Sequence, residues 1–432
     1  MDSIEVLILI LSFVILLGIG VPIAYSIGLS AMITLLVSMP SLPALTTLAQ
    51  RMATALDSFS LLAIPFFILA GQFMNRGGIA TRLIDLAKVL VGRLPGGLAF
   101  VNIISCMLFG AISGSAVAAA SAIGGFMVDR MEKEGYSKSF SAAINITSST
   151  TGLIIPPSNI LIIYSLASGG VSIAALFLAG YMPGLLLGMS LMTVAGVWAY
   201  VKKYPVGQTA GFQEFTRKTL RAFPSLLLLV IVIGGIVKGI FTATEASAIA
   251  VVYTAVLSMV FYKEVRWKDV PGIFIETSKT TAIVMLLIGT SMGMSWVMSF
   301  ENIPQEVSTA LITISDNKYV ILLIINLILL CVGIFMDMTP AVLIFTPIFL
   351  PVVEDLGMDP VHFGIVMVLN LCIGLCTPPV GSVLFVGVGV AKISIQKVIK
   401  PLVPLFLAML LALLLVTYFP EITLWLPRLF GF

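Results

Sequence analysis

Two apolar stretches decide the fold of this chain: NITSSTTGLIIPPSNILIIY at residues 145–164 and NLCIGLCTPPVGSVLFV at residues 370–386. Each carries two consecutive prolines near its middle. Proline donates no backbone hydrogen bond and disfavours helix in the residue before it, so we predict that both helices are interrupted there. Interrupted helices inside apolar segments are typical of secondary transporters.

The composition places these stretches in a lipid bilayer. Hydrophobic residues make up 59% of the 432 residues, charged residues 10%, and the mean hydropathy is +1.15. A soluble chain carries about 25% charged residues. We therefore predict an all-α, multi-pass membrane protein. The first apolar run, from Ile4, begins too early to follow a basic signal region, so we interpret it as a span.

Apolar runs and charges together predict about ten full spans and two re-entrant hairpins. Each hairpin, at residues 97–129 and 319–355, should consist of two half-length helices joined by small, polar or proline residues. The spans are expected at about residues 4–20, 22–38, 60–75, 138–170, 172–200, 223–241, 245–262, 281–300, 362–391 and 400–420.

This topology puts nearly all basic residues on one face. The exceptions are Arg51, Lys238, Lys318 and Arg428. The positive-inside rule makes the basic face cytoplasmic and both termini periplasmic. No basic patch is interleaved with aromatic residues, so we expect no nucleic acid partner.

A shift of 222 residues aligns the two halves of the chain. It places Gly152 on Gly374 and the prolines 156 and 157 on 378 and 379; Gly135 falls on Gly357. We expect two repeats, residues 1–221 and 222–432, each with scaffold spans, a hairpin, a broken span and a final span. Five crossings per repeat would invert the second copy, as in alternating-access transporters.

Two amphipathic segments precede the hairpins. One carries Ile79, Leu83, Leu86 and Leu90, and its counterpart is residues 303–315. We expect both to be interfacial arm helices. Arms around each hairpin favour an elevator mechanism with scaffold and transport regions, although they could also only anchor the protein.

Unwound backbone at membrane depth leaves carbonyls without partners, and a dehydrated sodium ion can satisfy them. We predict two sodium sites where the hairpin tips meet the helix breaks. The alternative is that these small residues only allow close helix crossings. The first predicted site comprises Gly110, Ser113, Gly152, Ile155 and Pro157, and the second comprises Gly333, Gly374, Thr377 and Val380.

An anionic substrate should lie where half-helix N-termini converge, because free N–H groups favour negative charge there. The predicted substrate residues are Ser115, Ser158, Asn159 and Ser382. Asp337, at the second tip, is the one acid predicted near the midplane; it could hold a cation, bind a substrate hydroxyl or anchor a hinge.

The cysteines and the histidine are expected to have structural roles. The four cysteines, Cys106, Cys331, Cys372 and Cys376, lie in apolar segments without the Cys/His pairing of zinc sites, so we expect small buried side chains and no transition metal. We interpret His362 as a structural or capping residue, with a proton relay as the alternative.

GAISGSAVA, IIPPS, DMTP and GLCTPPVG, in this order, resemble the large subunit (M protein) of tripartite ATP-independent periplasmic (TRAP) transporters. The resemblance implies sodium-driven uptake of an organic acid, such as a C4-dicarboxylate or sialic acid, across the bacterial inner membrane. It also implies two partners, a small four-span membrane subunit and a periplasmic substrate-binding protein. The chain starts directly at the first span of the M type, so a separate small subunit is expected.

Other function classes fit less well. A stand-alone sodium/dicarboxylate symporter would share the hairpins and breaks but need no binding protein. An intramembrane aspartyl protease needs two carboxylates, and the sequence offers Asp337 alone. A channel would need a charged ring or filter, and direct ATP coupling would need a GxxxxGK loop. We therefore expect a transporter subunit and no enzyme.

Overall fold

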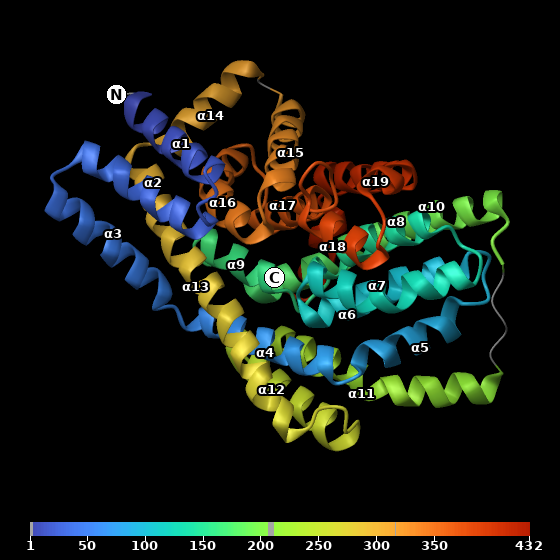
Figure 1. Ribbon diagram of the computed structural model, residues 1–432. Helices are drawn as coiled ribbons and strands as arrows, with labels where there is room; N and C mark the ends of the chain where they lie inside the picture. Colours follow the sequence, from blue (N-terminus) through green and yellow to red (C-terminus); the bar gives the residue numbers. More distant parts are fainter. Residues whose placement is uncertain (1–2, 206–210, 316) are drawn as a thin grey trace.

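The computed structural model describes residues 3–205, 211–315 and 317–432, and the regular structure in these ranges is helical (Figure 1). The first half contains α1 (Ser3–Gly18), α2 (Ile23–Ser38), α3 (Ser41–Leu56), α4 (Ala63–Arg76), α5 (Ile79–Val91), α6 (Gly97–Ser113), α7 (Ala116–Lys133), α8 (Lys138–Ser149), α9 (Asn159–Ala167) and α10 (Ile173–Lys202). The second half contains α11 (Phe212–Val237), α12 (Ala243–Val256), α13 (Val270–Phe300), α14 (Ile303–Ile314), α15 (Lys318–Phe335), α16 (Met338–Asp355), α17 (Pro360–Gly374), α18 (Ser382–Ala391), α19 (Ile395–Tyr418) and α20 (Glu421–Leu429).

Eight helical segments of the described residues are long and apolar enough to cross a membrane. The shorter α1 and α2 add two further apolar helices at the N-terminal end. A multi-pass membrane protein is therefore confirmed. Length alone does not separate the hairpin helices α15 and α16 from full spans, because both are among the eight.

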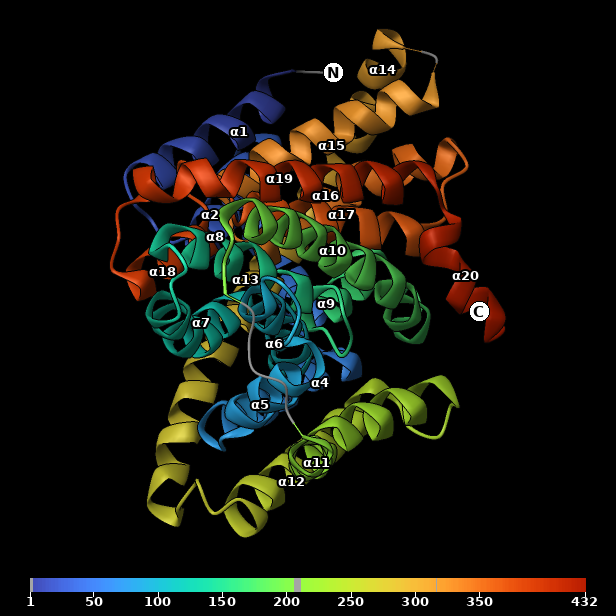
Figure 2. The ribbon, with the colours of Figure 1, turned by 90° about the vertical axis from the view of Figure 1, so that its right-hand side faces the viewer.

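The helices fall into two groups. The scaffold helices are α1–α4 and α11–α13, in which α2 packs on α13 and α4 on α12. The core helices are α6–α10 and α15–α20, in which α6 packs on α8 and α15 on α17. Figure 2 shows α11 and α12 lying apart from the compact core group, with α4 and α5 between them.

Both broken spans are interrupted where the paired prolines predicted it. Residues 150–158 separate α8 from α9, and residues 375–381 separate α17 from α18. The 156–157 and 378–379 peptide bonds are both cis. After each break the chain packs against the hairpin of the other half: α9 contacts α16, and α18 contacts α7.

The hairpin helices are longer than expected. The turns lie where predicted, at residues 114–115 and 336–337, but α6 has 17 residues and α7, α15 and α16 have 18 each. At 1.5 Å per residue such helices are about 26 Å long, so the half-length prediction was wrong. Helix continues into the charged ends, to Lys133 in α7 and from Lys318 in α15, because charged residues there do not stop it.

Both arm segments are helical. On α5, Ile79, Leu83 and Leu86 are buried against α6 and α11, while Leu90 is exposed. The counterpart α14 packs on α16. Two helices were missed, α3 and α20. Threonine, glutamine and arginine make α3 too polar to be recognised as a span, yet Leu48 and Met52 pack closely against Gly293 of α13.

Several predicted boundaries were also short. Helix α11 begins at Phe212 and α13 at Val270, each about three turns before the apolar run that predicted it.

Cys331 is exposed rather than buried, unlike the other three cysteines. The His362 ring is buried, with Nδ1 2.8 Å from Thr423 Oγ1 and Nε2 3.3 Å from the Thr417 carbonyl oxygen, and it joins α17 to the C-terminal helices.

Candidate functional site

The first hairpin and the first helix break meet through two glycines. A Cβ on Gly152 would lie 2.3 Å from the Gly110 Cα, and one on Gly110 would lie 2.8 Å from the Gly152 Cα. Both distances are shorter than any ordinary contact, so neither position has room for a side chain. The two backbones therefore lie in direct contact, as the predicted first site requires.

The second hairpin and second break meet in the same way. A Cβ on Gly374 would lie 2.5 Å from the Gly333 carbonyl carbon, and one on Gly333 would lie 3.1 Å from the Gly374 Cα. The predicted pairs, 110 with 152 and 333 with 374, are thus both in contact.

Several carbonyl oxygens at the breaks and hairpin tips have spare hydrogen-bonding capacity. No described residue donates a hydrogen bond to the carbonyl oxygens of Gly152, Ile155 or Pro157 in the first site, or to those of Gly333 or Val380 in the second. The carbonyls of Gly110, Gly374 and Thr377 accept one backbone hydrogen bond each, from Gly114, Thr377 and Gly381 respectively. A carbonyl oxygen has two lone pairs, so a second interaction remains possible at these three.

Two serine hydroxyls beside the breaks also have no partner. Within the described residues, Ser113 Oγ and Ser382 Oγ are buried without a hydrogen bond. Buried polar groups in folded proteins are nearly always paired, so such exceptions indicate an ion, a water or a ligand. The Thr377 hydroxyl, in contrast, donates to the Ile373 carbonyl oxygen over 2.7 Å.

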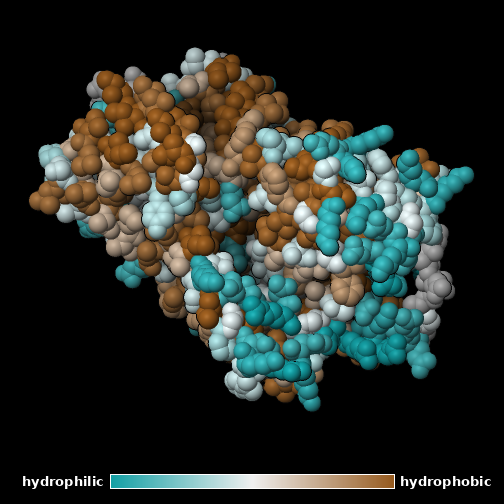
Figure 3. Space-filling view, viewed as in Figure 1, coloured by the Kyte–Doolittle hydropathy of each residue, from teal (hydrophilic) through white to brown (hydrophobic). Residues whose placement is uncertain are grey.

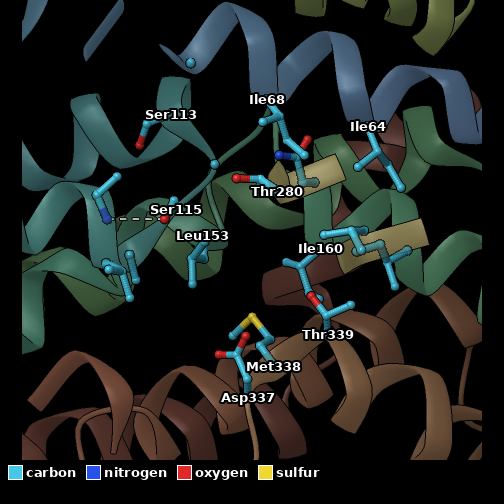
Figure 4. A pocket seen from close by; sticks show the side chains of 18 of the residues that line it. Ile64, Ile68, Ser113, Ser115, Leu153, Ile160, Thr280, Asp337, Met338 and Thr339 are labelled. Atoms are coloured by element: carbon cyan, nitrogen blue, oxygen red, sulfur yellow. Dashed lines mark hydrogen bonds between the residues drawn. The ribbon is translucent and has the colours of Figure 1, made fainter. Parts of the chain in front are cut away.

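A cavity of about 310 Å³ lies between the hairpin tips and the scaffold helices α4 and α13. Figure 3 shows the surface hollowed between an apolar region over α1 and α2 and a hydrophilic region toward α5 and α11. In Figure 4, Ser115 of the first hairpin and Asp337 of the second border the same space. Four of the five predicted substrate residues line it: Ser115, Asn159, Asp337 and Ser382.

The lining residues begin helices, as predicted. Ser115 caps α7, and its Oγ accepts a hydrogen bond from the Ala118 N–H over 3.2 Å. Asn159 is the first residue of α9 and Ser382 the first of α18. The hydroxyl proton of Ser115 and the Asn159 amide remain available to an anion.

Ser158 lies outside the cavity. It is fully buried, and its hydroxyl donates to the Leu153 carbonyl oxygen over 2.5 Å. The side chain therefore spans the first break and holds its shape.

Asp337 occupies the same place in its hairpin that Ser115 occupies in the first. Each is the cap residue of the second hairpin helix, and they are related by the 222-residue shift. The Asp337 side chain makes no capping hydrogen bond to α16. Its carboxylate is exposed in the cavity wall, within reach of a bound solute.

Sequence comparison identifies the family. Residues 10–422 match the DctM component of the tripartite ATP-independent periplasmic transporter. The chain belongs to this family.

Three relatives cover almost all of this chain. A Salmonella typhimurium protein, YgiK, described as uncharacterized, is 56% identical over 97% of this chain and 96% of its own. The C4-dicarboxylate TRAP transporter large permease protein DctM of Pseudomonas aeruginosa is 40% identical over 94% of both chains. The isethionate TRAP transporter permease protein DctMQ of Oleidesulfovibrio alaskensis is 42% identical over 95% of this chain and 64% of its own.

A solved structure shares the fold of this DctM-family chain. The YdaH transporter of Alcanivorax borkumensis aligns with a TM-score of 0.66 at 14% identity, covering 88% of this chain and 89% of that one. At this identity the likeness concerns the arrangement of helices alone.

Four further residues of the site were missed from sequence. Gly114 has a φ of +63°, and a Cβ there would lie 2.9 Å from the Asn159 amide nitrogen, so the tip needs glycine. Gln72, Asn75 and Thr280 line the cavity from the scaffold side. The GAISGSAVA stretch contained a signal for Gly114, whereas nothing in the sequence showed which faces of α4 and α13 meet the hairpin tips.

Proposed function

We propose that this DctM-family chain is the large membrane subunit of a transporter that takes up an organic acid using the sodium gradient. The observation that carries the proposal is the pair of glycine contacts, where unpaired carbonyl oxygens from a helix break meet a hairpin tip. Unwound carbonyls at such breaks are the groups that coordinate sodium in other transporter folds. The two sites would use Gly110, Ser113, Gly152, Ile155 and Pro157, and Gly333, Gly374, Thr377 and Val380.

The acid would bind in the cavity between the two sodium sites. Its carboxylate would face the N-termini of α7, α9 and α18, where free N–H groups and helix dipoles favour an anion. Ser115, Asn159 and Ser382 would donate hydrogen bonds, and Asp337 would accept one from a substrate hydroxyl. Ser158 would not contact the acid; its hydrogen bond to Leu153 would hold the shape of the first break. The named acids of relatives differ, C4-dicarboxylate and isethionate, so the family alone does not select the substrate.

Uptake would follow an elevator mechanism within an inverted repeat. The core helices would carry the acid and sodium past scaffold helices α4 and α13, with the arms α5 and α14 linking the groups. The basic residues would face the cytoplasm, with both termini in the periplasm.

Two partners are proposed, a small four-span membrane subunit and a periplasmic binding protein that delivers the acid. Support comes from family membership and from the DctMQ relative, of whose length this chain spans 64%.

Reconstitution tests the proposal. The chain and the small subunit encoded with it would be placed in proteoliposomes, and uptake of labelled succinate, sialic acid and isethionate measured under an inward sodium gradient, with and without the binding protein. Uptake that requires both sodium and binding protein supports the proposal. Uptake without binding protein identifies a stand-alone symporter, and uptake indifferent to sodium rules out the sodium sites.

A further inference from the structure

Three polar side chains line the cavity opposite the predicted substrate residues. Gln72 and Asn75 lie on α4 and Thr280 lies on α13, so all three belong to the scaffold helices. Every sodium and substrate residue predicted from sequence belongs instead to the core helices or to the breaks and turns between them. The cavity therefore has walls from two different groups of helices.

The α4 wall changes character along its length. Ile64, Ile68, Gln72 and Asn75 are spaced by four, four and three residues, which places them on one helix face. The first two are apolar and the last two are amides. Asn75 is exposed and is followed by Arg76, so the polar end of the wall lies toward the face that charge distribution assigns to the cytoplasm.

These side chains have free hydrogen-bonding capacity. No hydrogen bond joins the Gln72 or Asn75 side chain to any other described residue. Each amide carries two N–H donors. Thr280 Oγ1 donates to the Glu276 carbonyl oxygen over 3.0 Å, which leaves its lone pairs free to accept. No lysine or arginine lines the cavity in the described part of the chain, so neutral donors must hold an anion there.

Helix α4 also touches the hairpin that is proposed to move. A Cβ on Gly71 would lie 3.1 Å from the Ser113 carbonyl oxygen, so the scaffold backbone and the first hairpin tip lie against each other beside Gln72. If the core helices slide past α4, the residues of the core carry the acid with them. Gln72, Asn75 and Thr280 stay behind.

We propose that Gln72, Asn75 and Thr280 form a scaffold half of the substrate site, which binds the acid only while the cavity is open to the cytoplasm. The amides of Gln72 and Asn75 donate to the carboxylate, and Thr280 accepts from a substrate hydroxyl. This inference rests on the proposed function. It adds that the acid binds more tightly when the cavity is open to the cytoplasm than when it is open to the periplasm. Contacts made in one state alone strengthen binding in that state alone. Internal acid is then held by the scaffold, and accumulated acid slows further uptake.

The test compares affinity on the two sides of reconstituted vesicles. Gln72→Met and Asn75→Leu remove the amide donors at similar volume, and Gln50→Met, an exposed position on α3 outside the cavity, is the matched control. The labelled acid is whichever of succinate, sialic acid and isethionate the wild type takes up. One readout is the internal concentration of unlabelled acid that halves uptake. The other is the concentration of loaded binding protein that gives half-maximal uptake.

For each cavity variant, we expect the internal half-inhibitory concentration to rise about tenfold or more, because a hydrogen bond to a charged carboxylate is lost. The external value should stay within about twofold. Gln50→Met should change neither. Equal changes on both sides, a change on the outer side alone, or no change would each overturn the inference.

A variant without transport remains informative through thermal unfolding in detergent. The inference predicts a normal melting temperature and a reduced stabilisation by added acid; full stabilisation by acid would overturn it. If the wild type itself takes up none of the three acids, the proposed function fails first, before any variant is compared.

Discussion

Every residue of the first helix break, from Thr150 to Ser158, is buried, whereas Pro379 and Val380 of the second break are exposed. Both breaks contain a proline pair, and each has a glycine in contact with a hairpin tip: Gly152 within the first break and Gly374 at the end of α17, next to the second. Their backbone construction is therefore alike, and their surroundings differ. In this arrangement an ion at the second break would exchange with solvent directly. An ion at the first break could leave only after the hairpin moves.

The first break also has more side-chain hydrogen bonds to backbone carbonyls than the second. Near the first break, the hydroxyls of Thr150, Thr151 and Ser158 all donate to backbone carbonyls over 2.5–2.9 Å. The second break has the Thr377 hydroxyl and the thiol of Cys376, which donates weakly to the Ile146 carbonyl oxygen. More of the first break is held by its own side chains, so it should tolerate less change.

The largest effect is expected from methyl groups at the glycine contacts. Gly152→Ala places a Cβ against the Gly110 backbone inside a buried site, where neither backbone can move aside. Overpacking of this kind lowers stability by about 3 kcal/mol, the upper part of the usual range. Gly374 is also buried, but it borders a break whose Pro379 and Val380 are exposed and can relax, so Gly374→Ala should lower stability by about 1–2 kcal/mol. The apparent melting temperature and sodium-driven uptake measure both effects.

Two further glycines provide matched controls. A Cβ on Gly125 or Gly389 would meet no atom within 4 Å, so alanine at either position should be tolerated. If Gly374→Ala proves as damaging as Gly152→Ala, the difference in burial between the breaks has no energetic meaning.

Chemical labelling sharpens the contrast in access. In a Cys331→Ser background, Val380→Cys should react with a small maleimide roughly tenfold or more faster than Ile155→Cys, because thiol reactivity follows exposure. Sodium should slow the reaction of the cysteine at position 380 more than that of an exposed cysteine elsewhere. Similar rates at 155 and 380 would show that both breaks open to water.

The smallest effects are expected at the unpaired serines. Ser113→Ala should raise the sodium concentration for half-maximal uptake about fivefold. Ser382→Ala, at a proposed substrate residue, should instead raise the concentration of loaded binding protein for half-maximal uptake about twofold, because water can replace the hydroxyl at the more accessible break. Neither variant should melt at a lower temperature without sodium, because neither hydroxyl has a protein partner among the described residues. A drop in melting temperature without sodium would indicate a structural role instead.

The breaks and hairpin turns were predictable because their causes are local. Two prolines interrupt a helix in any surroundings, and a run of small and polar residues marks a turn. The contacts of Gly152 with Gly110 and of Gly374 with Gly333 were expected because each hairpin tip was paired with a helix break; the 222-residue shift aligned only Gly152 with Gly374.

What sequence could not supply depends on packing between distant segments. Helix α3 is amphipathic and pairs with α13, but its polar residues hid it in an apolar chain. Gln72, Asn75 and Thr280 belong to long apolar helices, and their meeting with the hairpin tips exists only in three dimensions. Ser158 was predicted to bind the substrate because it lies at a helix start. Its rotamer instead directs the hydroxyl to the Leu153 carbonyl oxygen.

The central claim is that both glycine contacts build sodium sites, and equilibrium binding of radioactive sodium to the purified chain with its small subunit tests it most directly. The account predicts saturable binding to the wild type, to Gly125→Ala and to Gly389→Ala, with a separate part of that binding lost in Gly152→Ala and in Gly374→Ala. Binding that is absent from the wild type, or unchanged in both contact variants, would contradict it.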